Sequence, residues 1–280
     1  MHPRGLPMPG WLSNISERSR QVECLEGHFK HGQTAYVLLD QRHAVEQCRS
    51  LLSLTGKRDF VVLFAGTPLS PLLEASPWLL DLEVGSEAWR YAQTLCQQRL
   101  GWVCQGRADQ TLLSIANHLG ALFVLDDPHG GKSLINLQQP AVYTALLASA
   151  SNSIYPHWLS PLAQVATPTP QGQWLMWQVK EPTSTTPERC QLTTEMEEAL
   201  KESQQAWWLS STTTMPMAEL PDSWLIRLGM LIEAGITRTE HFKRLLPLIQ
   251  RSEALPGRMQ AILAMDTPAR KKTQELESLI

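Results

Sequence analysis

The sequence predicts an α/β N-terminal lobe, with a mixed sheet flanked by helices, followed by a smaller and mostly α-helical C-terminal lobe. Short apolar runs alternate with helical periodicity as far as Leu147, and beyond Thr193 only helical periodicity continues. The 280 residues are 43% apolar and 18% charged, so the chain can bury the core of one large or two small domains.

The N-terminal lobe is predicted to interleave strands and helices. Residues 34–40 (TAYVLLD) and 59–64 (DFVVLF) are continuous apolar runs, which are typical of buried strands. The sequence DPHGGK lies between two further apolar runs and predicts a hairpin, which excludes a purely parallel sheet. The other predicted strands are 78–83, 101–105, 121–126 and 133–137, and the predicted helices are 44–52, 86–96, 109–119 and 140–147.

Three segments are predicted to organise the chain. Residues 1–165 form the α/β lobe, residues 166–192 form a linker that contains the one strand QWLMWQV, and residues 193–280 form the helical lobe. In that last segment Thr194 and Glu197 have the spacing of a helix-capping box, and a second helix is expected over 223–234.

An uncharged stretch runs from Ser133 to Val179. At 18% charged, these 47 residues would hold about eight charged side chains, and they hold none. Two interpretations remain open: a helix packed in the core followed by an uncharged linker, or a surface that faces a partner, because the cores of interfaces are depleted of charge.

Composition excludes several classes of protein. A net charge of −3 argues against a basic nucleic-acid coat. The five cysteines are odd in number and include no C-x-x-C pair, which argues against a zinc site or a disulfide scaffold and favours a reducing cytoplasm. Residues 1–12 have no apolar signal-peptide core, and no run of 18 apolar residues predicts a membrane span.

The sequence offers few candidates for catalysis. Asp126, Asp127 and His129 could hold a divalent metal, which would make the protein a metal-dependent hydrolase, although turn chemistry explains the same residues. Residues 130–133 (GGKS) resemble the end of a phosphate-binding loop, but Asp126 stands where that loop requires its first glycine.

Two further pairs have plain structural explanations. His28 and His31 could be half of a metal site or a surface pair. Cys104 and His118 could form a nucleophile and its base, whereas a core thiol explains Cys104 equally well. We therefore expect no catalytic residue, no metal and no cofactor.

Tryptophan is unusually frequent. The ten tryptophans outnumber both the four tyrosines and the five phenylalanines. Trp207 and Trp208 would point about 100° apart on a helix. Trp207 continues the apolar stripe, and Trp208 falls at its margin, where it is either a packed rim residue or an interface anchor.

The order of these segments resembles a known family, the effector adaptor chaperones of bacterial type VI secretion, often called Tap or Tec proteins. Four segments carry the resemblance: AYVLLDQ (35–41), LFAGTPLSPLLEASPWLLDLE (63–83), LLSIANHLGALFVLDDPHGGKSLINL (112–137) and IEAGITRTEHFKRLLPLI (232–249). The chain departs from the family at INLQQP (135–140). Asn136 and Gln139 stand where the family often has Arg and Asp, and only Pro140 is kept.

The resemblance implies a cytoplasmic, non-enzymatic protein that binds one toxic effector and loads it onto the spike protein of the secretion tube. It implies no nucleic-acid partner and no insertion into a membrane. Reversible binding favours a few aromatic anchors within a polar rim. The candidate partner-binding residues are Trp158, Trp174, Trp177, Trp207 and Trp208. Besides the hydrolase, the remaining alternative is a module of the α/β lobe that binds a small ligand.

Overall fold

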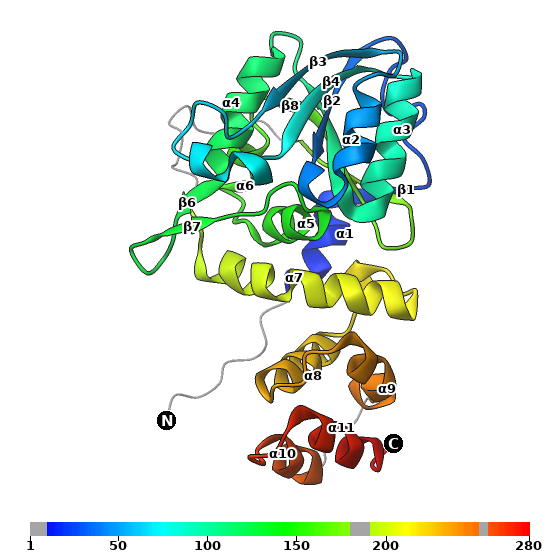
Figure 1. Cartoon of the computed structure of the whole chain (residues 1–280), viewed down its shortest axis with the longest axis vertical. Helices are drawn as coiled ribbons and strands as arrows, with labels where there is room; N and C mark the ends of the chain where they lie inside the picture. Colours follow the sequence, from blue (N-terminus) through cyan, green and yellow to red (C-terminus); the bar gives the residue numbers. More distant parts are fainter. Residues whose placement is uncertain (1–9, 180–190, 252–256) are drawn as a thin grey trace. The chain divides into compact units, whose positions relative to one another are not determined.

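The computed structural model describes residues 10–179, 191–251 and 257–280 (Figure 1). The chain divides into two compact units, Met1–Ala218 and Glu219–Ile280. The predicted boundary was near residue 165, which lies inside a strand of the first unit, and the division in the structure falls after Ala218.

Unit 1 is built on a seven-stranded sheet with the strand order β1-β9-β8-β5-β2-β4-β3. Its strands are β1 (Ser19–Val22), β2 (Thr34–Leu39), β3 (Lys57–Val62), β4 (Trp78–Glu83), β5 (Gly101–Gly106), β8 (Leu162–Pro168) and β9 (Trp174–Trp177). The helices are α1 (Ser13–Arg18), α2 (Val45–Leu51), α3 (Glu87–Leu95), α4 (Leu112–Leu122), α5 (Pro140–Ser149), α6 (Tyr155–Trp158) and α7 (Thr194–Thr213).

The predicted fold class is confirmed, with one correction to the sheet. The sheet was predicted to be mixed, and each of the six pairings among its described strands is antiparallel. The chain does make crossover connections: α2 links β2 to β3, and α3 links β4 to β5. In each case a third strand is inserted between the two that run in the same direction, so no parallel pair forms.

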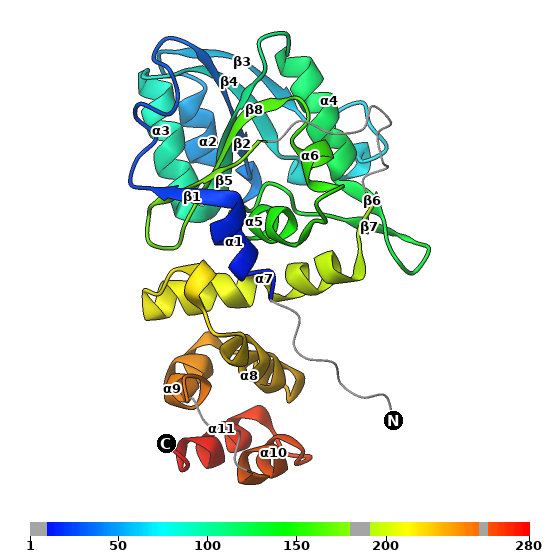
Figure 2. The ribbon, with the colours of Figure 1, turned by 180° about the vertical axis from the view of Figure 1, so that it is seen from behind.

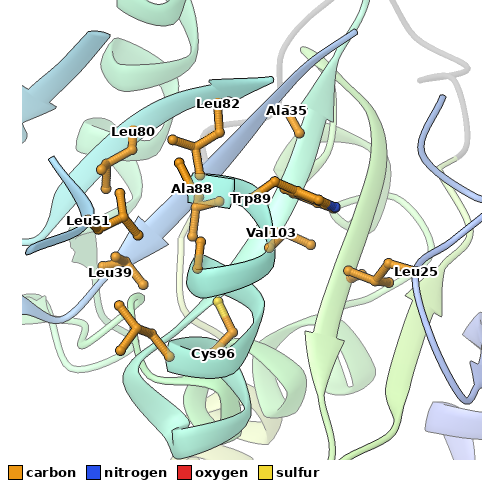
Figure 3. Close-up of a cluster of buried hydrophobic side chains, with 14 of the residues drawn as sticks. Leu25, Ala35, Leu39, Leu51, Leu80, Leu82, Ala88, Trp89, Cys96 and Val103 are labelled. Carbon is orange, nitrogen blue, oxygen red and sulfur yellow. The ribbon is translucent and has the colours of Figure 1, made fainter. Parts of the chain in front are cut away.

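Helices cover both faces of this sheet. On one face, α2 and α3 pack their apolar residues on alternate residues of β2, β4 and β5, among them Leu39, Leu80 and Val103 (Figure 3). On the opposite face Trp102 stacks on Tyr143 of α5, with ring centroids 4.1 Å apart, and donates its indole N–H to the Leu137 carbonyl. The predicted hairpin forms as β6 (Val124–Asp126) and β7 (Lys132–Leu134), a separate two-stranded sheet.

Helix α5 is enclosed on every side. Nine of its ten residues are buried, because α5 lies between the sheet and α7, with α1 beside it (Figure 2). The buried face of α7 consists mainly of small residues, including Ala199, Ser203 and Ala206, which permit close packing of the two helices. The helix within the uncharged stretch is therefore core, as the first interpretation proposed, and β8 and β9 extend that core where a linker was predicted.

Unit 2 consists of α8 (Asp222–Glu233), α9 (Thr239–Ile249), α10 (Gly257–Leu263) and α11 (Ala269–Glu277). Two buried cations hold the ends of its helices. The Lys272 ammonium donates to the carbonyls of Ala234 and Leu263, at 3.0 and 2.9 Å. The Arg227 guanidinium donates to the carbonyls of Ile249 and Arg251. The carbonyl end of a helix carries partial negative charge, so these contacts stabilise three helix ends in one small core.

We expect Ala145→Asp in α5 to lower the free energy of unfolding by about 3 kcal/mol or more, because it buries an unpaired carboxylate. Urea unfolding measures the change. The matched control is Gln47→Asp on α2, where the side chain is exposed and the loss should be small. Equal effects of the two substitutions would contradict the enclosure of α5.

We expect Lys272→Met to destabilise unit 2 by about 1–3 kcal/mol, because two partly buried carbonyls at helix ends lose their donor. The neighbouring exposed residue provides the control, Lys271→Met. Amide hydrogen exchange in α8 and α10 should accelerate only in the first variant. Unchanged exchange would show that the ammonium contributes nothing to these helix ends.

Candidate functional site

The structure places four of the five candidate tryptophans in the core of unit 1. Trp158, Trp174, Trp177 and Trp207 expose 0%, 1%, 4% and 3% of their surface. Their selection as partner-binding candidates implied accessible surface, which these four side chains lack. Trp208 is half-buried, so it is the member of this set that presents surface to a partner without rearrangement.

The buried tryptophans are fixed by specific contacts. Trp177 donates its indole N–H to Thr167 Oγ1 at 2.9 Å, and Thr167 lies 3.1 Å from the hydroxyl of Thr144 in α5. The Arg99 guanidinium lies 5.0 Å from the ring centroid of Trp207. These contacts fix Trp177 and Trp207 within the core of unit 1.

In the hairpin, the Asp127 carboxylate stabilises the turn by accepting backbone hydrogen bonds. Asp127 Oδ1 accepts hydrogen bonds from the backbone amides of Gly131 and His129, at 2.9 and 3.0 Å. The amide of Gly131 is the main reason that the pKa of Asp127 is below its usual value. His129 Nε2 lies 3.0 Å from Glu197 Oε2 on α7. Within the described ranges, no three His, Cys, Asp or Glu side chains are grouped so that they could hold a metal ion.

Three residues of the two weaker pairs have structural surroundings of their own. His28 Nδ1 lies 3.3 Å from the Arg20 guanidinium. Burial raises the pKa of the Cys104 thiol, which is typical of an unreactive core cysteine. His118 Nε2 lies 2.9 Å from the Trp158 carbonyl, and burial lowers the pKa of His118.

The substituted family motif has a role in packing. Gln139, which stands where the family often has Asp, accepts a hydrogen bond from Gln204 of α7 at 3.0 Å. Gln204 in turn accepts from Arg99 at 2.6 Å. The preceding Gln138 donates to Asp40 Oδ2 at 3.4 Å, at the end of β2. Neutral amides therefore connect α5 to α7 and to the sheet in this chain.

Sequence reasoning missed a groove of about 750 Å³ on unit 1. It lies between the loop 24–31, the turn Val84–Gly85 and the outer face of α3. From the sequence EGHFKHG in this region, only a possible metal site at His28 and His31 was considered. The groove is formed by segments about 60 residues apart, which no local pattern connects.

Comparison with models of protein families gives a match in unit 1. Residues 35–154 match the model of a family described as a domain of unknown function, DUF4123. That domain is found in effector adaptor proteins of type VI secretion systems. No curated protein and no solved structure matches the chain significantly. Among the described residues, no helix combines the length and apolar character needed to span a bilayer.

We expect the hairpin turn to stay ordered as pH falls until Asp127 is protonated, below the usual range of an aspartate. A carboxylate with a lowered pKa contributes its hydrogen bonds above that pKa and loses them as pH falls through it. NMR titration of the Gly131 amide measures the midpoint. In Asp127→Asn the acid-dependent shift should disappear. A midpoint at or above that of an ordinary aspartate would contradict the assignment.

Proposed function

We propose that this protein is a cytoplasmic, non-enzymatic adaptor that binds one toxic effector and loads it onto the spike protein of a type VI secretion system. The observation that carries the proposal is the match of residues 35–154 to a domain found in such adaptors. The matched segment includes the central strands β2, β4 and β5, the hairpin and α5.

The fourth segment of the family resemblance lies outside that match, in unit 2. Residues 232–249 comprise the end of α8 and the whole of α9. Gly235 follows α8 with φ of +85°, a backbone conformation that glycine adopts without steric cost. The Ala-Gly-Ile sequence thus has a defined structural purpose in unit 2, which is to turn the chain between two helices.

The metal-dependent hydrolase is not favoured. The Asp127 carboxylate already accepts two backbone hydrogen bonds within its own turn, and His129 lies against Glu197 of α7. Asp127 and His129 therefore have structural roles, and Asp126 ends β6, where it pairs with Lys132 of β7.

The test is an affinity purification of the tagged protein from cells that express their type VI apparatus, followed by mass spectrometry. We expect one large toxin-like protein to co-purify, together with or without a spike protein. A tagged, unrelated cytoplasmic protein of similar size is the control. Recovery of no specific partner from such cells would overturn the adaptor function.

Adjacent tryptophans offer a matched pair for locating the effector surface. We expect Trp208→Ala to weaken effector recovery several-fold, because half-buried aromatic residues anchor interfaces, with a nearly unchanged melting temperature. Trp207→Ala should instead lower the melting temperature, because it empties a buried site beside Arg99. Normal effector recovery by a stable Trp208→Ala variant would exclude this residue from the interface.

A further inference from the structure

The groove of unit 1 has an apolar floor and a charged rim. Leu25, Phe29, Val84 and Trp89 line it and are all buried. The rings of Phe29 and Trp89 are tilted, with centroids 5.3 Å apart. A volume of about 750 Å³ is within the range of pockets that bind small organic ligands.

Contacts of the backbone and of two side chains hold the groove in its shape. The amide of Gly32 donates to the Val84 carbonyl at 2.9 Å, which fixes the end of the loop to the turn. The His31 ring packs against Gly85 so closely that a Cβ at Gly85 would lie 2.2 Å from it. Arg90 donates to the Gly85 carbonyl at 2.8 Å. The site is therefore formed before any ligand arrives.

Trp89 presents an indole donor to this groove. The residue is only 4% exposed, and its indole N–H has no acceptor among the residues that the structure describes. Figure 3 shows the indole nitrogen at the end of the ring farthest from α3, on the side of Leu25, which also lines the groove. The indole nitrogen itself retains accessible surface, so its N–H can donate to a hydrogen-bond acceptor on a ligand in the groove.

The rim is weakly cationic. Lys30 and Arg90 approach the groove from the loop and from α3, and Glu26 is the one acidic residue that lines it. In the described part of the chain, neither cation forms an ion pair with a carboxylate. With His31 neutral, the lining carries a net charge of +1, from two cations and one anion.

We propose that this groove binds a carboxylate with an apolar body. The apolar body packs on Leu25 and Phe29, an acceptor oxygen takes the Trp89 N–H, and Lys30 and Arg90 neutralise the carboxylate. This chemistry is shared by free aromatic or aliphatic acids and by the C-terminal carboxylate of a polypeptide with an apolar last residue. The inference does not depend on the adaptor function.

Isothermal titration calorimetry of the full chain tests the proposal with 3-phenylpropionate and its neutral amide, 3-phenylpropionamide. We expect saturable binding of the acid at micromolar to millimolar concentration, and binding of the amide weakened about tenfold. Lys30→Gln should weaken binding of the acid and leave binding of the amide nearly unchanged. Lys243→Gln, an exposed lysine of unit 2, is the matched control and should bind as the unmodified chain does.

Trp89→Phe tests the indole donor, because it keeps a ring in the core and removes the N–H. Thermal melting verifies that this variant folds, and its affinity for the acid should fall about tenfold. A tripeptide that ends in phenylalanine, with a free or an amidated C-terminus, distinguishes the two sources. Tighter binding of the free tripeptide than of phenylpropionate identifies a polypeptide end, and the reverse identifies a small molecule.

Three results would overturn the proposal: no binding of any acid at millimolar concentration, equal binding of acid and amide, or Lys30→Gln and folded Trp89→Phe variants that bind as the unmodified chain does.

Discussion

The burial of α5 between the sheet and α7 is the constraint on which unit 1 depends. An unpaired charge on a helix enclosed on all sides is strongly unfavourable, and the segment that contains α5 has no charged residue from Ser133 to Val179. The enclosure also requires α7, since without it the outer side of α5 would be exposed apolar surface. Polar contacts from Arg99 and Gln139 to Gln204 fix α7 in register over this helix.

This arrangement explains which parts of the fold could be predicted from the sequence. The apolar runs at 34–40 and 78–83 predicted β2 and β4, because a buried strand leaves a local pattern. The order of the strands leaves no such pattern. The insertion of β2 between β4 and β5 makes the sheet antiparallel, and α7 joins unit 1 through contacts with a helix some 50 residues earlier.

The candidate site shows the same division between local and long-range information. Residue type alone selected the tryptophans as candidates for partner binding. The exposed fraction of each side chain depends instead on which elements pack against its ring. Trp174 and Trp177 are in a strand with sheet neighbours on both sides, so they are core. Helical geometry did separate Trp207 from Trp208, because consecutive residues point about 100° apart and Trp208 falls at the margin of the buried face. The Asp127 turn was equally local and was predicted with its chemistry.

The groove is formed partly by residues inside the family match and partly by residues that precede it. Its α3 wall and the Val84–Gly85 turn lie within the segment that matches the adaptor-associated domain, and the loop 24–31 precedes that segment. Leu25 and Phe29 anchor this loop in the core, whereas Glu26 and Lys30 are exposed. The charge at the rim can therefore change without loss of the apolar floor or of the sheet beneath it. Ligand selectivity at this groove is separable from the stability of the fold, and this separation makes Lys30→Gln an informative variant.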